Sequence, residues 1–197
     1  VLTLFVFTGV SFVLLTTCGF SQDNWYQFGF KVSTNIPANR NYSNVGDYLE
    51  SLVSADFGGF FRAGKYVCGE IGLGYTFYKG TYSCDNATTS YNNEKVETRY
   101  LQLPIKVVGY VPLGQAQSAI LPYVGIIYQP LRQVTDNEID FSKTTIEKNM
   151  TLFTAGLDLK FGFIVLGANY RYSFQNFFKN KEGKKPQYVN FCVGFQF

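Results

Sequence analysis

The feature that most constrains this chain is a repeated alternation of apolar residues with polar or small ones. Residues 100–107 show it most clearly, with leucine, isoleucine or valine at every second position and with Gln102 and Lys106 between them. A period of two places successive side chains on opposite faces of a β-strand. Alternation of this kind predicts strands with one apolar and one polar face.

The same pattern recurs along the chain in segments of about ten residues, the length with which a tilted strand crosses a bilayer. Two of the segments are weaker than the others, those at residues 54–62 and 120–131, and no helical period competes with them. The predicted strands cover residues 26–33, 54–62, 70–77, 100–107, 120–131, 153–161, 164–172 and 189–197.

The connections between these segments alternate between long and short. The short ones lie at residues 63–65, at residues 112–114 and at Gly162, whereas the long ones cover residues 35–53, 79–96, 132–149 and 175–187. Outer-membrane barrels have short periplasmic turns, longer external loops and both termini on the periplasmic side. We therefore predict an all-β fold, an eight-stranded antiparallel up-and-down transmembrane β-barrel.

Alternation alone does not tell which face points outward. The polar face is rich in glycine, serine and threonine, which leave room in a narrow interior for long charged side chains that pair with one another. The chain ends on an aromatic residue, Phe197, and rings gather near strand ends, as at membrane–water boundaries. The predicted lumen network consists of Lys31, Asp56, Glu70, Gln102, Lys106, Asp158, Lys160, Asn169 and Arg171.

The first 21 residues carry no charge and are almost continuously apolar. We predict that residues 1–21 are a secretory signal peptide and that residues 22–197 form the barrel domain. The segment lacks an initiating Met and a basic start, so we expect the printed sequence to begin inside the signal. An uncleaved membrane anchor and lipidation at Cys18 are the alternatives. Of the remaining cysteines, Cys68 and Cys192 are predicted to fill the lumen and Cys84 to lie in a loop.

The composition disfavours catalysis. There is no His, the commonest general base and transition-metal ligand, so we predict neither an enzyme nor a metal or cofactor site. The carboxylates of the polar face are interpreted as partners in structural ion pairs. A net charge of +3 indicates no nucleic-acid partner. An interior of eight strands is filled by side chains, which argues against a general porin.

The last long loop is basic and has aromatic residues beside it. Its lysines could contact lipid phosphates at the outer leaflet, or they could simply be solvated. Outer-membrane lipid, the barrel-assembly machinery and a protein bound at the external loops are the expected partners. The candidate residues for lipid or partner binding are Lys179, Lys181, Lys184 and Lys185.

Two motifs resemble those of PorT-like outer-membrane β-barrel proteins. Residues 99–105 (RYLQLPI) are similar to the family strand R-Y-L-E-I-P-[LI], with Gln102 in place of the acidic residue. Residues 121–125 (LPYVG) are similar to the strand K-P-Y-[VL]-G, with Leu121 in place of the lysine. The resemblance implies an eight-stranded barrel in a bacterial outer membrane and implies little about activity.

The sequence is compatible with three functions. The first is a structural or binding scaffold with a packed polar lumen and four external loops. The second is a narrow channel or an accessory component of a transport or secretion complex. The third is a soluble, lipocalin-like carrier of an apolar ligand, whose apolar face would point inward.

Overall fold

The computed structural model describes residues 25–38, 47–86, 89–114, 117–135, 146–177 and 185–197. No helix among these residues is long and apolar enough to cross a membrane. The strands are β1 (Tyr26–Pro37), β2 (Asp47–Gly64), β3 (Val67–Asn86), β4 (Thr89–Gly109), β5 (Val111–Pro112), β6 (Ser118–Val134), β7 (Asn149–Phe161), β8 (Ile164–Ser173) and β9 (Gln187–Gln196).

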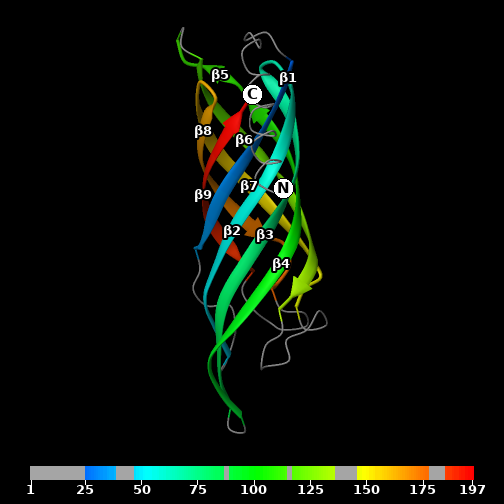
Figure 1. Ribbon diagram of the computed structural model, residues 1–197, viewed down its shortest axis with the longest axis vertical. Coiled ribbons are helices and arrows are strands. Elements are labelled where there is room, and N and C mark those ends of the chain that lie inside the picture. Colours follow the sequence, from blue (N-terminus) through cyan, green and yellow to red (C-terminus); the bar gives the residue numbers. More distant parts are fainter. Residues whose placement is uncertain (1–24, 39–46, 87–88, 115–116, 136–145, 178–184) are drawn as a thin grey trace, which may run out of the picture.

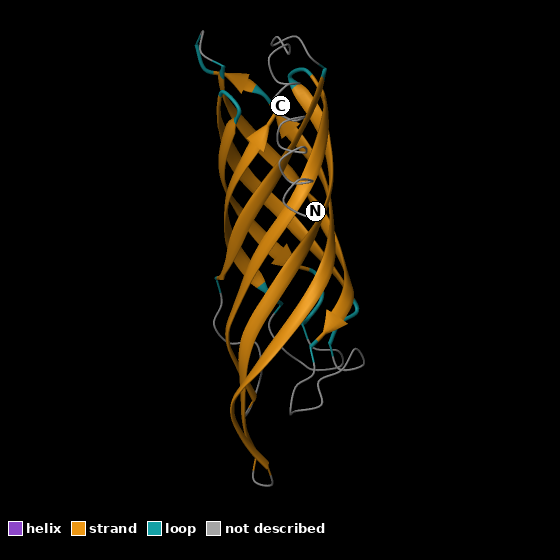
Figure 2. Ribbon diagram, in the orientation of Figure 1, coloured by secondary structure: helices purple, strands orange, loops and turns teal. Residues whose placement is uncertain are grey.

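The strands form one closed sheet (Figures 1 and 2). Each long strand pairs antiparallel with the next, and β1 pairs with β9 to close the barrel. The short strand β5 follows β4 along the same edge of β6. The two count as one strand of the barrel, which therefore has eight strands. The predicted eight-stranded antiparallel barrel is thereby confirmed.

The three predicted short turns lie together at one end of the barrel, the upper end in Figure 1. Each contains a glycine with a positive φ: 132° at Gly64, 64° at Gly114 and 60° at Gly162. Glycine adopts this region of backbone space without the steric cost that a Cβ imposes. We call this end of the barrel the turn end and the opposite one the loop end.

The prediction of a long loop over residues 79–96 is wrong. Strand β3 continues to Asn86 and β4 begins at Thr89, so that the two form a hairpin beyond the barrel (Figure 1). This stretch carries polar residues on both faces, and its alternation is therefore too weak to mark a strand. Cys84 lies on β3, where its register partner is Tyr91, rather than in the predicted loop.

The barrel has an apolar exterior and a polar interior. Leu73 and Ile105 on the outer face are 58% and 56% exposed, whereas Asp158 and Glu70 on the inner face are 0% and 1% exposed. A soluble barrel arranges its faces the other way round. The outer face therefore suits contact with lipid, and the inner face needs internal partners for its polar groups.

Glycines make the polar interior possible. The inner faces of neighbouring strands repeatedly place a glycine beside a long or bulky residue in register. A Cβ at Gly194 would lie 2.7 Å from Cγ of Lys31, and a Cβ at Gly125 would lie 2.8 Å from Cγ of Lys106. The side chain of one strand thus lies across the glycine of the next. The register pairs of this kind are Gly29 with Phe60, Gly194 with Lys31, Gly125 with Lys106, Gly167 with Asp158 and Gly156 with Asn169.

Adding one methyl group at Gly125 tests this arrangement. We expect Gly125→Ala to lower the free energy of unfolding by about 1–3 kcal/mol, because the new Cβ overpacks the Lys106 side chain and backbone. Urea unfolding in detergent micelles measures the loss. The matched control is Gly69→Ala on the exposed outer face, where nothing lies within 4 Å of the added Cβ. Equal stability of the two variants would contradict the steric role of Gly125.

Candidate functional site

The interior contains three groups of ion pairs. In the first, Glu70 on β3 lies between two cations from the strands on either side. Its Oε2 accepts hydrogen bonds from Nε and Nη2 of Arg62 at 3.2 and 2.5 Å, and its Oε1 accepts one from Nζ of Lys106 at 2.7 Å. Arg62 also donates to Gln196 at 2.9 Å. Both cations are register partners of Glu70, so this group forms between adjacent strands.

The second group joins strands that are not neighbours. Nζ of Lys31 on β1 lies 2.5 Å from Oδ2 of Asp158 on β7, with β9 and β8 between them in the sheet. Lys31 passes over Gly194 of β9, and Asp158 passes over Gly167 of β8. Because neither glycine has a side chain, Lys31 and Asp158 can extend across the two intervening strands and meet inside the barrel.

The third group centres on Asp56 and Arg171. Nη1 of Arg171 lies 2.5 Å from Oδ2 of Asp56, while Oδ1 of Asp56 accepts a hydrogen bond from Asn35 at 3.0 Å. Arg171 also donates to Asn169, which donates to Asn190 at 2.6 Å, and Asn190 donates to Asn35 at 2.8 Å. The network therefore closes on itself through side-chain amides.

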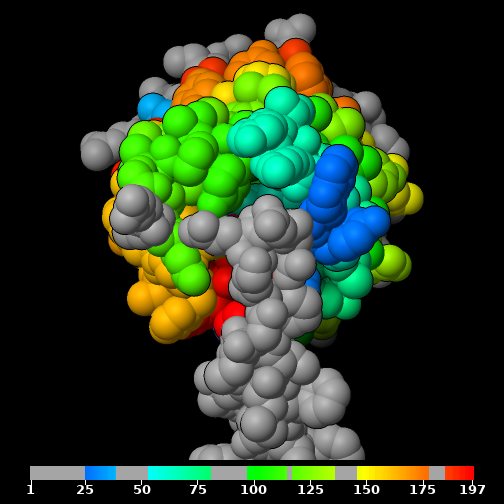
Figure 3. All heavy atoms as spheres, turned by 90° about the horizontal axis from the view of Figure 1, so that it is seen from above, coloured from blue at the N-terminus to red at the C-terminus, as the bar shows by residue number. Residues whose placement is uncertain are grey.

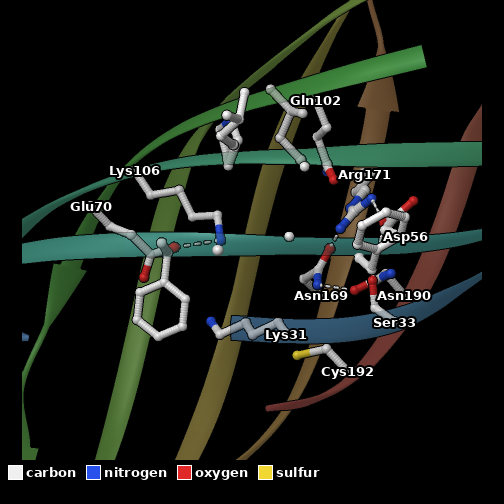
Figure 4. Close-up of a pocket in the computed structure, with 18 of the residues that line it drawn as sticks. Lys31, Ser33, Asp56, Glu70, Gln102, Lys106, Asn169, Arg171, Asn190 and Cys192 are labelled. Carbon is white, nitrogen blue, oxygen red and sulfur yellow. Dashed lines mark hydrogen bonds and ion pairs between the residues drawn. The ribbon is translucent and has the colours of Figure 1, made fainter. Parts of the chain in front are cut away.

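Most of the predicted lumen residues take part in these contacts. Lys31, Asp56, Glu70, Lys106, Asp158, Asn169 and Arg171 belong to the three groups, most of which Figure 4 labels. Gln102 is 7% exposed and lies on the same inner face. Lys160 lies nearer the turn end, half-buried, and forms no ion pair within the described part of the chain.

Sequence reasoning missed Arg62, which is 1% exposed and completes the first group. It lies at the end of segment 54–62, where the glycine pair 58–59 and the phenylalanine pair 60–61 obscure the alternation. Counting every second residue from Asp56 would have found it. Of the predicted loop lysines, Lys179, Lys181 and Lys184 lie outside the described residues. Lys185 is exposed, with Nζ 5.9 Å from the ring centroid of Tyr172.

An apolar cluster fills the lumen towards the loop end. Two of its members, Ile146 and Phe177, come from outside the strands and are 0% and 2% exposed. The backbone beside them is held in place, because Tyr100 donates to the carbonyl of Glu147 at 3.0 Å. The cluster comprises Tyr78, Tyr100, Ile127, Ile146, Met150, Leu152, Phe177 and Tyr188.

A second apolar cluster fills the lumen towards the turn end. Figure 3 views the molecule from that end. It comprises Cys68, Val108, Ala119, Leu121 and Tyr123. Cys68 and Cys192 are both buried free thiols, as expected of residues that fill the interior. The ion pairs therefore lie between two apolar layers.

One cavity of about 60 Å³ remains among the ion pairs (Figure 4). Its wall includes the cations Lys31, Lys106 and Arg171, together with Gly58 and Gly74. The described residues contain no group of three or more His, Cys, Asp or Glu side chains that could hold a metal ion. The carboxylates Asp56 and Glu70 also line the cavity, so its wall carries charges of both signs.

Comparisons with solved structures identify the class of fold. The chain is similar to the outer membrane protein OprG from Pseudomonas aeruginosa, with a TM-score of 0.51 and 9% identity over 87% of this chain and 95% of that one. Ail of Yersinia pestis (TM-score 0.42, 11% identity, 87% and 97% covered) and LpxR from Salmonella typhimurium (0.38, 8%, 86% and 99%) are less similar. The likeness to OprG shows an outer-membrane barrel fold.

No family model matches the chain. No curated protein matches it either. The resemblance to PorT-like barrels therefore stays a prediction that rests on its two short motifs.

The buried ion pairs make a testable contribution to stability. We expect Asp56→Asn to lower the free energy of unfolding by about 3 kcal/mol, because it leaves the buried charge of Arg171 without its partner. The control is Lys79→Met, which breaks the exposed Lys79–Glu97 pair, where Lys79 is 70% exposed. Exposed pairs contribute little. Urea unfolding in micelles compares the two, and similar losses would show that burial of the pair is unimportant.

Proposed function

We propose that this protein is an integral outer-membrane scaffold that presents its external loops and keeps its lumen closed to solutes. The described side chains fill the lumen along its length, and this filling supports the proposal. Ion pairs occupy the middle, and apolar clusters that include Tyr78 and Leu121 occupy the two ends. A conducting barrel needs a continuous polar path.

The exterior supports residence in a membrane. Each of the eight barrel strands has exposed large apolar side chains. Among them are Phe28, Val124 and Phe191, which are 43%, 52% and 49% exposed. Such a surface is stable against lipid and would aggregate in water. We infer a bacterial outer-membrane location, reached through the periplasm with residues 1–21 as the export signal and with help from the barrel-assembly machinery.

The arrangement does not favour the soluble carrier. A carrier of an apolar ligand needs a large apolar cavity inside, whereas the cavity in the described lumen is small and has charged side chains in its wall. We also infer that the barrel catalyses no reaction. The luminal carboxylates of the described residues, Asp56, Glu70 and Asp158, each accept a hydrogen bond from a cation, so none of these three is poised to act on a substrate.

We propose that partners bind at the loop end of the barrel. The β3–β4 hairpin extends the sheet beyond the barrel (Figure 1). Lys185, which precedes β9, is exposed. We infer that this end meets lipid phosphates or a protein partner. The narrow channel, or an accessory role in transport, is the competing function.

Single-channel recording on the reconstituted barrel separates the scaffold from the channel. We expect no steady conductance from the unaltered protein, because both ends of its lumen are packed. The matched variants are Lys106→Met and Asp158→Asn, which alter the lumen, and Lys79→Met, which alters an exposed site. A steady conductance that is abolished by the luminal variants and kept by Lys79→Met would establish the channel instead.

Site-directed labelling tests the orientation of the faces in a bilayer. Single cysteines at Ile105 and Leu157, in a background without other cysteines, should react with a lipid-soluble reagent, because both positions are exposed on the outer face. Cysteines at Gln102 and Asp158 should be protected, since these positions are 7% and 0% exposed. The reverse pattern would rule out the membrane-embedded barrel.

A further inference from the structure

The wall of the luminal cavity includes two glycines on adjacent strands. Gly58 of β2 and Gly74 of β3 are register partners, and both belong to the cavity wall. Their backbones are in close contact, because a Cβ at Gly58 would lie 2.9 Å from Cα of Gly74. No side chain projects from either residue, so this part of the wall is bare backbone and the space in front of it stays open.

Two ammonium groups border the same cavity. The Lys31 and Lys106 side chains both line the cavity, and they keep 14% and 12% of their surface exposed, whereas their carboxylate partners are 0% and 1% exposed. Their Nζ atoms lie 5.8 and 4.8 Å from the centroid of the Tyr123 ring. Both ammonium groups therefore lie near the same ring, and Figure 4 shows the Lys31 and Lys106 side chains ending in the same region of the cavity.

The charges of the described ion-pair network do not balance. Four cations, Lys31, Arg62, Lys106 and Arg171, pair with three carboxylates, which leaves one positive charge in excess. The excess lies at Glu70, the carboxylate that two cations share. A buried charge without a counter-charge is costly, because it loses hydration and gains no partner.

The carboxylate oxygens that border the cavity are already engaged. Both oxygens of Glu70 accept hydrogen bonds from cations, and both oxygens of Asp56 accept hydrogen bonds from neighbouring side chains, including Ser33 and Asn35. The ammonium groups of the two lysines each have three N–H donors, of which the carboxylates use one. The unused donors and the excess charge lie around the same small cavity.

We propose that the cavity binds one small monovalent inorganic anion of halide size, between the ammonium groups of Lys31 and Lys106. A volume of about 60 Å³ holds such an ion with a few waters, since one water needs roughly 10–15 Å³ of this space. The anion neutralises the excess charge. It does so whether or not the barrel conducts, so the site is independent of the closed lumen proposed above.

Bromide is the probe, because its anomalous scattering locates it in a crystal. The unaltered protein is refolded from urea into micelles in bromide, so that the ion is enclosed as the barrel closes. We expect one anomalous peak within hydrogen-bond distance of both Nζ atoms. A cavity occupied by water alone, or a peak elsewhere, would overturn the proposal.

Stability gives a second readout. Bromide is exchanged for an anion too large for the cavity at constant ionic strength, and urea unfolding is followed. Above the dissociation constant, each tenfold increase in bromide should raise the ratio of folded to unfolded protein about tenfold. Unfolding that is independent of the choice of anion would contradict a bound ion.

Lys106→Met is the matched variant. It makes the network neutral and leaves Glu70 bound by Arg62 through two hydrogen bonds, so the barrel should fold. We expect the bromide dependence to disappear in this variant. The control is Lys160→Met, which removes the same charge from the interior at a position that does not line the cavity. This control should keep the dependence; loss in both variants, or in neither, would refute the assignment.

Discussion

The narrowness of an eight-stranded barrel is the constraint on which this structure depends. Its interior is just wide enough for side chains to fill, so long residues on adjacent strands cannot occupy the same level. The register of the strands avoids such clashes, because it places a glycine beside each of several long residues. Examples are Gly194 beside Lys31 and Gly125 beside Lys106. Removing the Cβ on one strand gives the neighbouring side chain room to lie flat against the wall.

That steric solution also determines the electrostatics. A lysine that lies across a glycine extends towards the next strand, and in this way Lys31 on β1 reaches Asp158 on β7. Ion pairs of this kind offset the desolvation of the charges, while apolar clusters at both ends keep bulk water away. Where two glycines meet, at Gly58 and Gly74, no side chain fills the gap and a cavity remains.

Much of the fold could be predicted from the sequence, since strands between a polar and an apolar environment alternate strictly. The three short turns and the closed antiparallel order agree with the prediction. The β3–β4 hairpin was not predicted because residues 79–96 do not alternate between apolar and polar types in the sequence. Arg62 was missed because the glycines and Phe residues around it obscure the period locally.

The order of residue types already shows which positions alternate, where the chain turns tightly and which polar side chains share a face. Which of those side chains meet depends on how the sheet closes. Arg62 pairs with Glu70 across one strand boundary, whereas Lys31 and Asp158 lie 127 residues apart and meet through the lumen. The physical reason is that closure of the sheet through β1 and β9 sets the register of all eight barrel strands relative to one another. No local pattern in the sequence encodes that register.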